Sequence, residues 1–225
     1  MNRRATSAPA HSTRELLILT AERLFAEQGI DGVSLRQINW AAGQRNLSAT
    51  HYHFGSKESL IAAIYAFRMG RVNERRLALL DRIEAEGRQS DVRALVEGIV
   101  TPVMEEIDSG PGGAHYIRFL AQVIGHPQLR LEDVRSSRHA DGLQRIAAHL
   151  RHALPHVPPR ISGQRIGLMW EQVTHALADR ERLRKGTPGV SAALFVANLL
   201  DVVTAGLMTP VGPATLRELK RGAKA

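Results

Sequence analysis

Apolar residues recur at helical spacing along most of the chain. Leu143, Ile146, Ala147 and Leu150 show it most clearly, because they fall at i, i+3, i+4 and i+7 on one helix face. Other segments of helical length and period are 56–86, with Gly70 as a candidate interruption, 91–107, 113–124, 137–153, 161–183 and 191–208. No segment alternates with the period of a strand, and no internal repeat is found. The sequence therefore predicts an all-α fold of about nine helices.

The first forty residues contain the start signals of two helices. Ser12 with Glu15, and Ser34 with Gln37, are capping-box pairs, in which each side chain satisfies a backbone N–H of the other residue. Gly29 is expected to end the first helix, because glycine readily adopts the backbone conformation found just after a helix.

A third, shorter helix is predicted after the turn at Gly43. It begins at Asn46 or Ser48 and runs through His53, about two turns at 3.6 residues per turn. A helix this short needs neighbours to hold it. Its side chains are small or hydrogen-bonding, unlike the Glu and Lys mixture of a solvated face, and they are Ser48, Ala49, Thr50, His51, Tyr52 and His53. Two short helices around a glycine turn, with these residues on the second, are typical of a helix-turn-helix that reads the DNA major groove.

Loop signals divide the chain into four parts. Residues 1–11 are small, polar or proline and predict a flexible arm, in which Arg3 and Arg4 could reach DNA or simply belong to a chain terminus. Residues 12–57 form the predicted head, 58–210 a larger helical domain and 211–225 a tail. No apolar stretch follows the two arginines, so we expect no signal peptide.

Composition narrows the class of protein. The 225 residues are 44% hydrophobic and 23% charged, as in ordinary globular proteins, and they include no cysteine. The absence of cysteine excludes disulfides and thiolate metal sites and suits a cytoplasmic protein. The formal charge of +8 favours a polyanionic partner, although the basic residues are spread along the chain.

The most apolar segment is 192–208. A membrane span needs about 20 residues and tolerates a central Asp poorly, so this segment, interrupted by Asn198, Asp201 and Thr204, is not predicted to cross a membrane. A helix that is apolar nearly all round is expected to pack on both sides, one against its own domain and one against a second subunit.

Signatures of catalysis and of metal binding are weak. The chain has no G-x-S-x-G, H-E-x-x-H, Walker or G-x-G-x-x-G motif, so no enzyme activity and no cofactor are predicted. His149, His152 and His156 have spacing that can hold a metal, but no carboxylate or thiol joins them in the sequence. His51 and His53 lie two residues apart and point to different helix faces.

The residues from Ile38 to Glu58 carry a family resemblance. Ile38, Ala42 and Gly43 are followed by the aromatic-rich run 51–54 and then by Gly55, Ser56, Lys57 and Glu58. In this pattern the chain resembles the tetracycline-repressor (TetR) family of bacterial regulators over about its first quarter. It departs from the pattern at Asn39 and Trp40 and in a turn about one residue longer than usual.

The resemblance implies roles for individual residues on double-stranded operator DNA. Tyr52 and Lys57 would contact phosphates. Side chains at or near the base edges would be those of Ser48, Ala49, Thr50, His51 and His53. Arg45 and Asn46, in or beside the turn, are further candidate contacts.

The resemblance also implies a dimer and an effector. Segments 161–183 and 191–208 would form the interface of a homodimer that binds a palindromic operator, usually as a repressor. An unknown small molecule would bind in the larger domain, where candidate lining residues, each of a kind found more often in a core than in contact with a ligand, are Met104, Tyr116, Phe119, Gln122, Trp170 and His175. The alternative is a non-catalytic helical module whose basic surface binds acidic proteins, and sequence-specific protection of DNA would distinguish the two.

Overall fold

The computed structural model describes residues 12–46, 48–110, 112–127, 129, 140–183 and 191–222. Within these residues the regular secondary structure is helical throughout, as the sequence predicts. Ten helices are described there: α1 (Thr13–Gln28), α2 (Leu35–Ala41), α3 (Ala49–Phe54), α4 (Lys57–Ala85), α5 (Val92–Asp108), α6 (Gly113–Ile124), α8 (Asp141–Ala153), α9 (Pro159–Leu183), α10 (Ala192–Met208) and α11 (Pro213–Arg221). The predicted arm, residues 1–11, lies outside the described residues.

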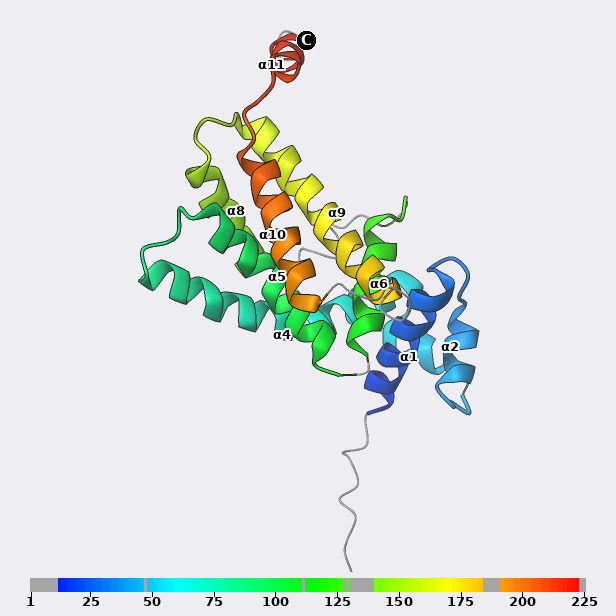
Figure 1. Ribbon diagram of the computed structural model, residues 1–225. Coiled ribbons are helices and arrows are strands. Elements are labelled where there is room, and N and C mark those ends of the chain that lie inside the picture. The colour runs from blue at the N-terminus through cyan, green and yellow to red at the C-terminus, as the bar shows by residue number, and fades with distance from the viewer. Residues whose placement is uncertain are drawn as a thin grey trace, which may run out of the picture.

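Helices α1, α2 and α3 form the N-terminal head, beside α6 and the end of α9 in Figure 1. Both predicted capping boxes are present, at Ser12 and at Ser34. Gly29 ends α1 with a φ of 79°, in the region that favours glycine, and its N–H bonds to the carbonyl of Phe25. Phe25 and Ile38 are fully buried in the small core that joins α1 to α2.

Helix α4 connects the head to the larger domain. Its 29 residues continue through Gly70 without the interruption considered from the sequence, and at 1.5 Å per residue they span about 43 Å. One face of α4 is buried along its length, from Leu60 near the start to Ile83 near the end. A displacement at one end of such a packed helix can therefore be passed to the other.

The larger domain is built from α5, α6, α8, α9 and α10: α5 and α8 pack on α4, α6 and α10 pack on α5, and α9 packs on α6 and α10. Helix α1 of the head packs against α6 of this domain, so the two parts share an extensive contact. Helix α9 begins at Pro159, two residues before its predicted start, and α11 is an additional helix within the segment predicted as a tail. Residues 137–139, the predicted start of α8, lie outside the described residues.

Helices α9 and α10 lie side by side on one face of the domain, and α11 lies at the end of the molecule far from the head (Figure 1). In the described part of the chain, no single helix is long and apolar enough to cross a membrane. Helices α10 and α11 satisfy a test of length and composition only as a pair bent by 53°.

Candidate DNA interface and the seam behind it

A buried polar contact fixes the short helix α3 against α2. The side-chain oxygen of Asn39 on α2 accepts two hydrogen bonds from Thr50 on α3, one from the backbone N–H at 2.9 Å and one from the hydroxyl at 2.6 Å. Both residues are buried, at 1% and 0% exposure. Asn39, which departs from the family pattern, thus supplies the acceptor that this two-helix arrangement needs.

The turn before α3 shows which of the two predicted helix starts is used. Helix α3 begins at Ala49, and Ser48 occupies the N-cap position without capping the helix through its side chain. The side-chain oxygen of Asn46 instead accepts the N–H of Ser48 at 2.9 Å. The turn itself contains Gly43, with a φ of 66°.

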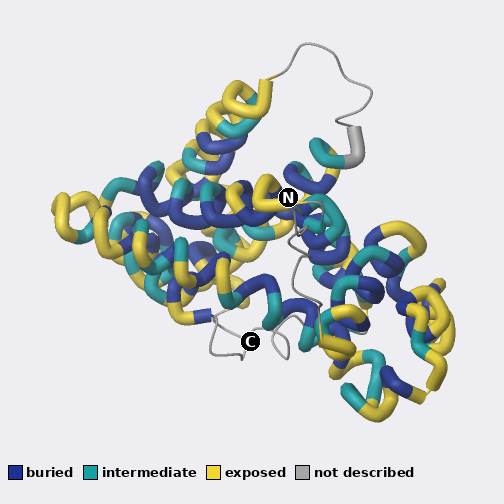
Figure 2. Tube along the Cα trace, turned by 90° about the horizontal axis from the view of Figure 1, so that it is seen from below, coloured by how far each residue is buried: buried dark blue, intermediate teal, exposed yellow. Residues whose placement is uncertain are grey.

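Most of the predicted DNA-binding residues lie exposed on one edge of the head. Arg45, Asn46, Ser48, His51 and Tyr52 are exposed, with Tyr52 at 83%, and exposed segments gather on the outer side of the head in Figure 2. His53 is half-buried. Trp40 of α2 is 79% exposed, so it does not pack on its neighbours and adds a second exposed aromatic ring to the head.

Two of the predicted base contacts require correction. Ala49 and Thr50 are buried, at 7% and 0% exposure, and both hydrogen-bonding groups of Thr50 engage Asn39. Because the face of α3 that carries them packs on the head, neither side chain is presented to a base edge. Their role is to hold α3 in place.

Lys57 is the first residue of α4 and is half-buried. Its ammonium lies 5.7 Å from the centre of the Phe25 ring, at a distance where a cation is attracted to an aromatic face. Ser56 caps this helix, accepting the N–H of Ser59. The lysine is therefore held beside a helix N-terminus, where a phosphate would be favoured.

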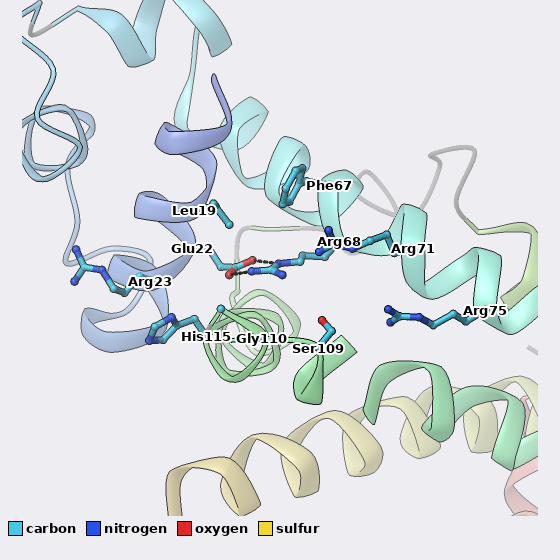
Figure 3. Close-up of a pocket in the computed structure, with 11 residues that line it drawn as sticks. Leu19, Glu22, Arg23, Phe67, Arg68, Arg71, Arg75, Ser109, Gly110 and His115 are labelled. Carbon is cyan, nitrogen blue, oxygen red and sulfur yellow. Dashed lines mark hydrogen bonds and ion pairs between the residues drawn. The ribbon is translucent and has the colours of Figure 1, made fainter. Parts of the chain in front are cut away.

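Behind the head, a buried ion cluster joins α1, α4 and α5. Arg68 of α4 donates to both carboxylate oxygens of Glu22 on α1, at 2.6 and 2.7 Å, and to Glu106 on α5 at 3.0 Å. Glu106 also accepts from Arg71 at 2.6 Å and from Arg75 at 3.1 Å. Figure 3 shows Glu22 and Arg68 pointing toward each other across the seam between head and larger domain.

The two carboxylates of this cluster respond differently to burial. Burial raises the pKa of Glu22, and the hydrogen bond and charge of Arg68 compensate only in part. Burial acts in the same direction on Glu106, but Arg71 and Arg68 outweigh it and lower the pKa of that group. Burial is the largest cause in both groups, and Glu106 has hydrogen bonds from three arginines to offset it, whereas Glu22 has them from one.

A cavity of about 570 Å³ opens at the same seam. The residues that line it are Leu19, Glu22, Arg23, Phe67, Arg68, Arg71, Arg75, Ser109, Gly110, Gly112 and His115 (Figure 3). None of them was singled out from the sequence. The available signals were an acidic residue within the apolar face of α1, another at the end of the apolar helix α5, and the arginines on α4.

Comparisons with known proteins agree with this geometry. Two family models match the chain: "Bacterial regulatory proteins, tetR family" over residues 17–64 and "Tetracyclin repressor-like, C-terminal domain" over residues 97–206. The chain belongs to the TetR family of transcription regulators. Its head is the DNA-binding helix-turn-helix of that family.

Solved structures of TetR regulators share the fold. A TetR-family transcription regulator from Shewanella sp. PV-4 is 19% identical, with 88% of this chain and 97% of that chain covered and a TM-score of 0.60. AibR in complex with isovaleryl coenzyme A and operator DNA is 15% identical, with coverages of 89% and 100% and a TM-score of 0.53. No curated protein matches the chain.

The residues predicted to line a TetR effector pocket are not brought together. Met104, Tyr116 and Phe119 are buried in the core and line neither the seam cavity nor a second cavity of about 600 Å³. Gln122 and His175 do line that second cavity, which lies between α1, α6 and α9.

Trp170, the last of the predicted lining residues, is half-buried and packs on the core outside both cavities. Of the six predicted residues, two line the second cavity and four lie in or against the core, outside both the seam cavity and the second cavity.

One member of the candidate histidine cluster, His149 on α8, contacts an acidic residue of α4. His149 bonds to Glu84 of α4 at 2.7 Å, and Arg145 binds the same carboxylate. These contacts lower the pKa of Glu84 to about 2, with the hydrogen bond from Arg145 as the largest cause. Among the residues that the structure describes, no group of three or more His, Cys, Asp or Glu could hold a metal.

Proposed function

We propose that this TetR-family regulator binds a palindromic operator as a homodimer and responds to a small-molecule effector. The observation that carries the proposal is α3, a two-turn helix held by the Asn39–Thr50 contact with His51 and Tyr52 left exposed. The fold shared with AibR, which is solved with isovaleryl coenzyme A and operator DNA, supports both kinds of partner. Such a regulator would act in the cytoplasm, usually as a repressor, and would need no catalytic activity.

The proposed DNA contacts are those of the predicted residues that are accessible. His51, with Ser48 and the half-buried His53, would lie at the base edges. Tyr52 and Lys57 would contact phosphates, with Arg45 and Asn46 as additional contacts near the turn. Phosphate contacts position the helix and base contacts give the sequence preference, so the two groups should respond differently to substitution.

The proposed dimer interface is the exposed face of α9 and α10. Large apolar side chains lie on it between 49% and 64% exposed, namely Leu168, Leu194, Val202 and Met208. Gly163, Gly167 and Gly206 face open space there and would allow a close approach of helices. Leu199 and Val203, also on α10, are buried within the subunit, so the helix packs on one side and leaves the other for a partner.

Two recognition helices related by a two-fold axis require half-sites about one DNA turn apart, roughly 10 to 10.5 bp, or a multiple of that spacing. Footprinting on DNA selected by the protein tests this geometry. A symmetric footprint is expected, and a single asymmetric site bound at full affinity, or no protected sequence at all, would contradict the proposal. The second outcome would favour an acidic protein as the partner.

A matched pair of lysine variants tests the phosphate contact. Lys57→Ala should weaken binding equally on operator and scrambled DNA and reduce the salt dependence by roughly one counterion per subunit. Lys220→Ala removes the same charge from α11, far from the head, and should change neither quantity. His51→Ala should instead lower affinity on the operator alone, by roughly 1 to 3 kcal/mol.

A further inference from the structure

Arg76 of α4 is a buried cation with most of its hydrogen-bonding capacity unused. The residue is 0% exposed, and its Nε donates to the carbonyl of Gly98 on α5 at 3.1 Å. Its two terminal nitrogens have no hydrogen-bond partner among the described residues. Arg68, two turns earlier on the same helix, shows the usual arrangement, because two carboxylates accept from it.

A second unsatisfied donor is present in the same electrostatic neighbourhood. The hydroxyl of Tyr116 on α6 is fully buried and also has no partner in the described part of the chain. The Tyr116 and Arg76 groups influence each other's pKa, and burial raises that of the tyrosine well above its usual value. Tyr116 therefore keeps its proton and remains a donor.

The aliphatic part of the Arg76 side chain is closely packed. Gly142, in the first turn of α8, packs so closely that a Cβ there would lie 2.9 Å from the Cδ of Arg76. The Gly142 N–H is bonded at 3.1 Å to the side-chain oxygen of Asn73, one turn before Arg76 on α4. Ile146 and Leu80 lie close to Gly98, so the surroundings of its carbonyl are apolar. Arg76 thus lies where α4, α5 and α8 meet, and no carboxylate of the described residues is bonded to it.

Such an arrangement is costly for the protein alone. An unpaired buried charge destabilises a fold by several kcal/mol, and buried donors almost always have acceptors. Burial lowers the pKa of Arg76 to about 10, which still leaves it charged near neutral pH. The three donor groups, the two terminal nitrogens of Arg76 and the hydroxyl of Tyr116, match an anion that the described residues do not supply.

We propose that Arg76 and Tyr116 bind the carboxylate of an effector whose body is apolar. This assignment rests on the proposed function, since it names the chemical class of the effector. A carboxylate accepts two parallel N–H bonds from a guanidinium and brings one charge against one. A phosphate dianion would leave a negative charge without compensation in the apolar surroundings. Because Arg76 is fully buried, the helices must open for the ligand to enter.

The first experiment measures thermal unfolding without ligand. Arg76→Met keeps much of the volume and removes the unpaired charge, but it also takes the Nε–H away from the Gly98 carbonyl, so its melting temperature should fall far less than that of Arg68→Met. Arg68→Met is the matched control on the same helix, and its melting temperature should fall because it leaves Glu22 unpaired. A fall for Arg76→Met as large as that control would show a structural guanidinium and overturn the proposal.

The second experiment uses straight-chain carboxylates from acetate to decanoate, each compared with its amide at constant chloride concentration and ionic strength. At least one carboxylate should raise the melting temperature of the wild type more than its amide does. Arg76→Met should abolish this shift. Tyr116→Phe should weaken binding about tenfold, the effect of losing one hydrogen bond to a charged group.

Three further results would overturn the proposal. The first is a series in which no carboxylate exceeds its amide, and the second is a shift that chloride alone reproduces. The third concerns the carboxylates of Glu132 and Asp133, which lie outside the described residues. If a Glu132→Gln, Asp133→Asn variant lowers the melting temperature in wild-type protein but not in Arg76→Met, an internal carboxylate is the partner. Footprinting of ligand-free protein tests the proposed function separately, because operator binding does not depend on the effector being an acid.

Discussion

The substitution Arg68→Met, at the seam between the head and the larger domain, offers the sharpest test of the structure. Arg68 provides both hydrogen bonds that Glu22 receives from a side chain, at 2.6 and 2.7 Å, and the Glu22 side chain is only 1% exposed. Glu106 would keep Arg71 and Arg75 as partners. The substitution therefore leaves one buried carboxylate without compensation, and breaking a buried pair in this way costs about 3 to 5 kcal/mol of unfolding free energy.

The loss should depend on pH, with a sign fixed by Glu22. Its pKa in the folded protein is already raised above 4.5, because burial outweighs Arg68. A carboxyl of this kind binds its proton more tightly when folded, so the free energy of unfolding falls as pH rises from about 4.5 through the folded pKa. Without Arg68 that pKa rises further and the window widens. The deficit of Arg68→Met should be full at alkaline pH and shrink as the pH approaches 4.5.

Urea unfolding followed by circular dichroism measures the loss of unfolding free energy and its pH dependence. The titrations are made at about pH 8 and about pH 5, at one protein concentration. The double variant Glu22→Leu, Arg68→Met should recover most of the loss at pH 8, since an apolar pair can replace a buried ion pair at little cost. The reasoning is refuted if Arg68→Met is as stable as the wild type at about pH 8, or if its deficit is the same at both pH values.

Three further predictions concern other parts of the molecule. Asn39→Ala removes the acceptor of two buried donors and should lower unfolding free energy by about 1 to 3 kcal/mol in urea titrations, whereas Thr50→Val, which keeps the backbone bond, should lower it less. Val202→Asp should convert a dimer into a folded monomer near 24.7 kDa by light scattering, and an unchanged dimer would exclude the α10 face. Glu84, whose pKa Arg145 lowers to about 2, stabilises the fold above about pH 4.5, so the deficit of Glu84→Gln should close as pH falls toward 2 in acid unfolding curves.

Local interactions explain what could be predicted from the sequence. The capping boxes at Ser12 and Ser34 form between residues three apart, so their geometry follows from the helix itself. The turn at Gly43 is local in the same sense. The helix-turn-helix could therefore be placed to within about one residue, and the exposed positions of His51 and Tyr52 agree with the interpretation of α3 as a recognition helix.

Long-range packing explains what the sequence did not reveal. Thr50 has a hydroxyl of the kind that can contact DNA, yet its hydrogen-bond partner Asn39 lies eleven residues away in the sequence. Thr50 is buried only because α3 docks on α2. Glu22 and Glu106 could be noted as charged residues in apolar helices, but their common partner, Arg68, is separated from them by 46 and 38 residues. The predicted effector residues stay a prediction for the same reason, because periodicity identifies core positions without showing which of them surround a cavity.

Helix α4 explains how ligand binding in the larger domain could change the affinity of the head for DNA. It begins with Lys57 at the head, continues through Arg68 in the seam and carries Arg76 in the larger domain, all within one uninterrupted helix. A ligand at Arg76 can change DNA affinity only by as much as it prefers one arrangement of this helix over another. Typical couplings of 1 to 3 kcal/mol correspond to roughly 5- to 150-fold in affinity, which relief of a single buried charge is large enough to supply. The bonds of Arg68 to Glu22 oppose independent movement of head and helix, so α1 and α4 should shift together.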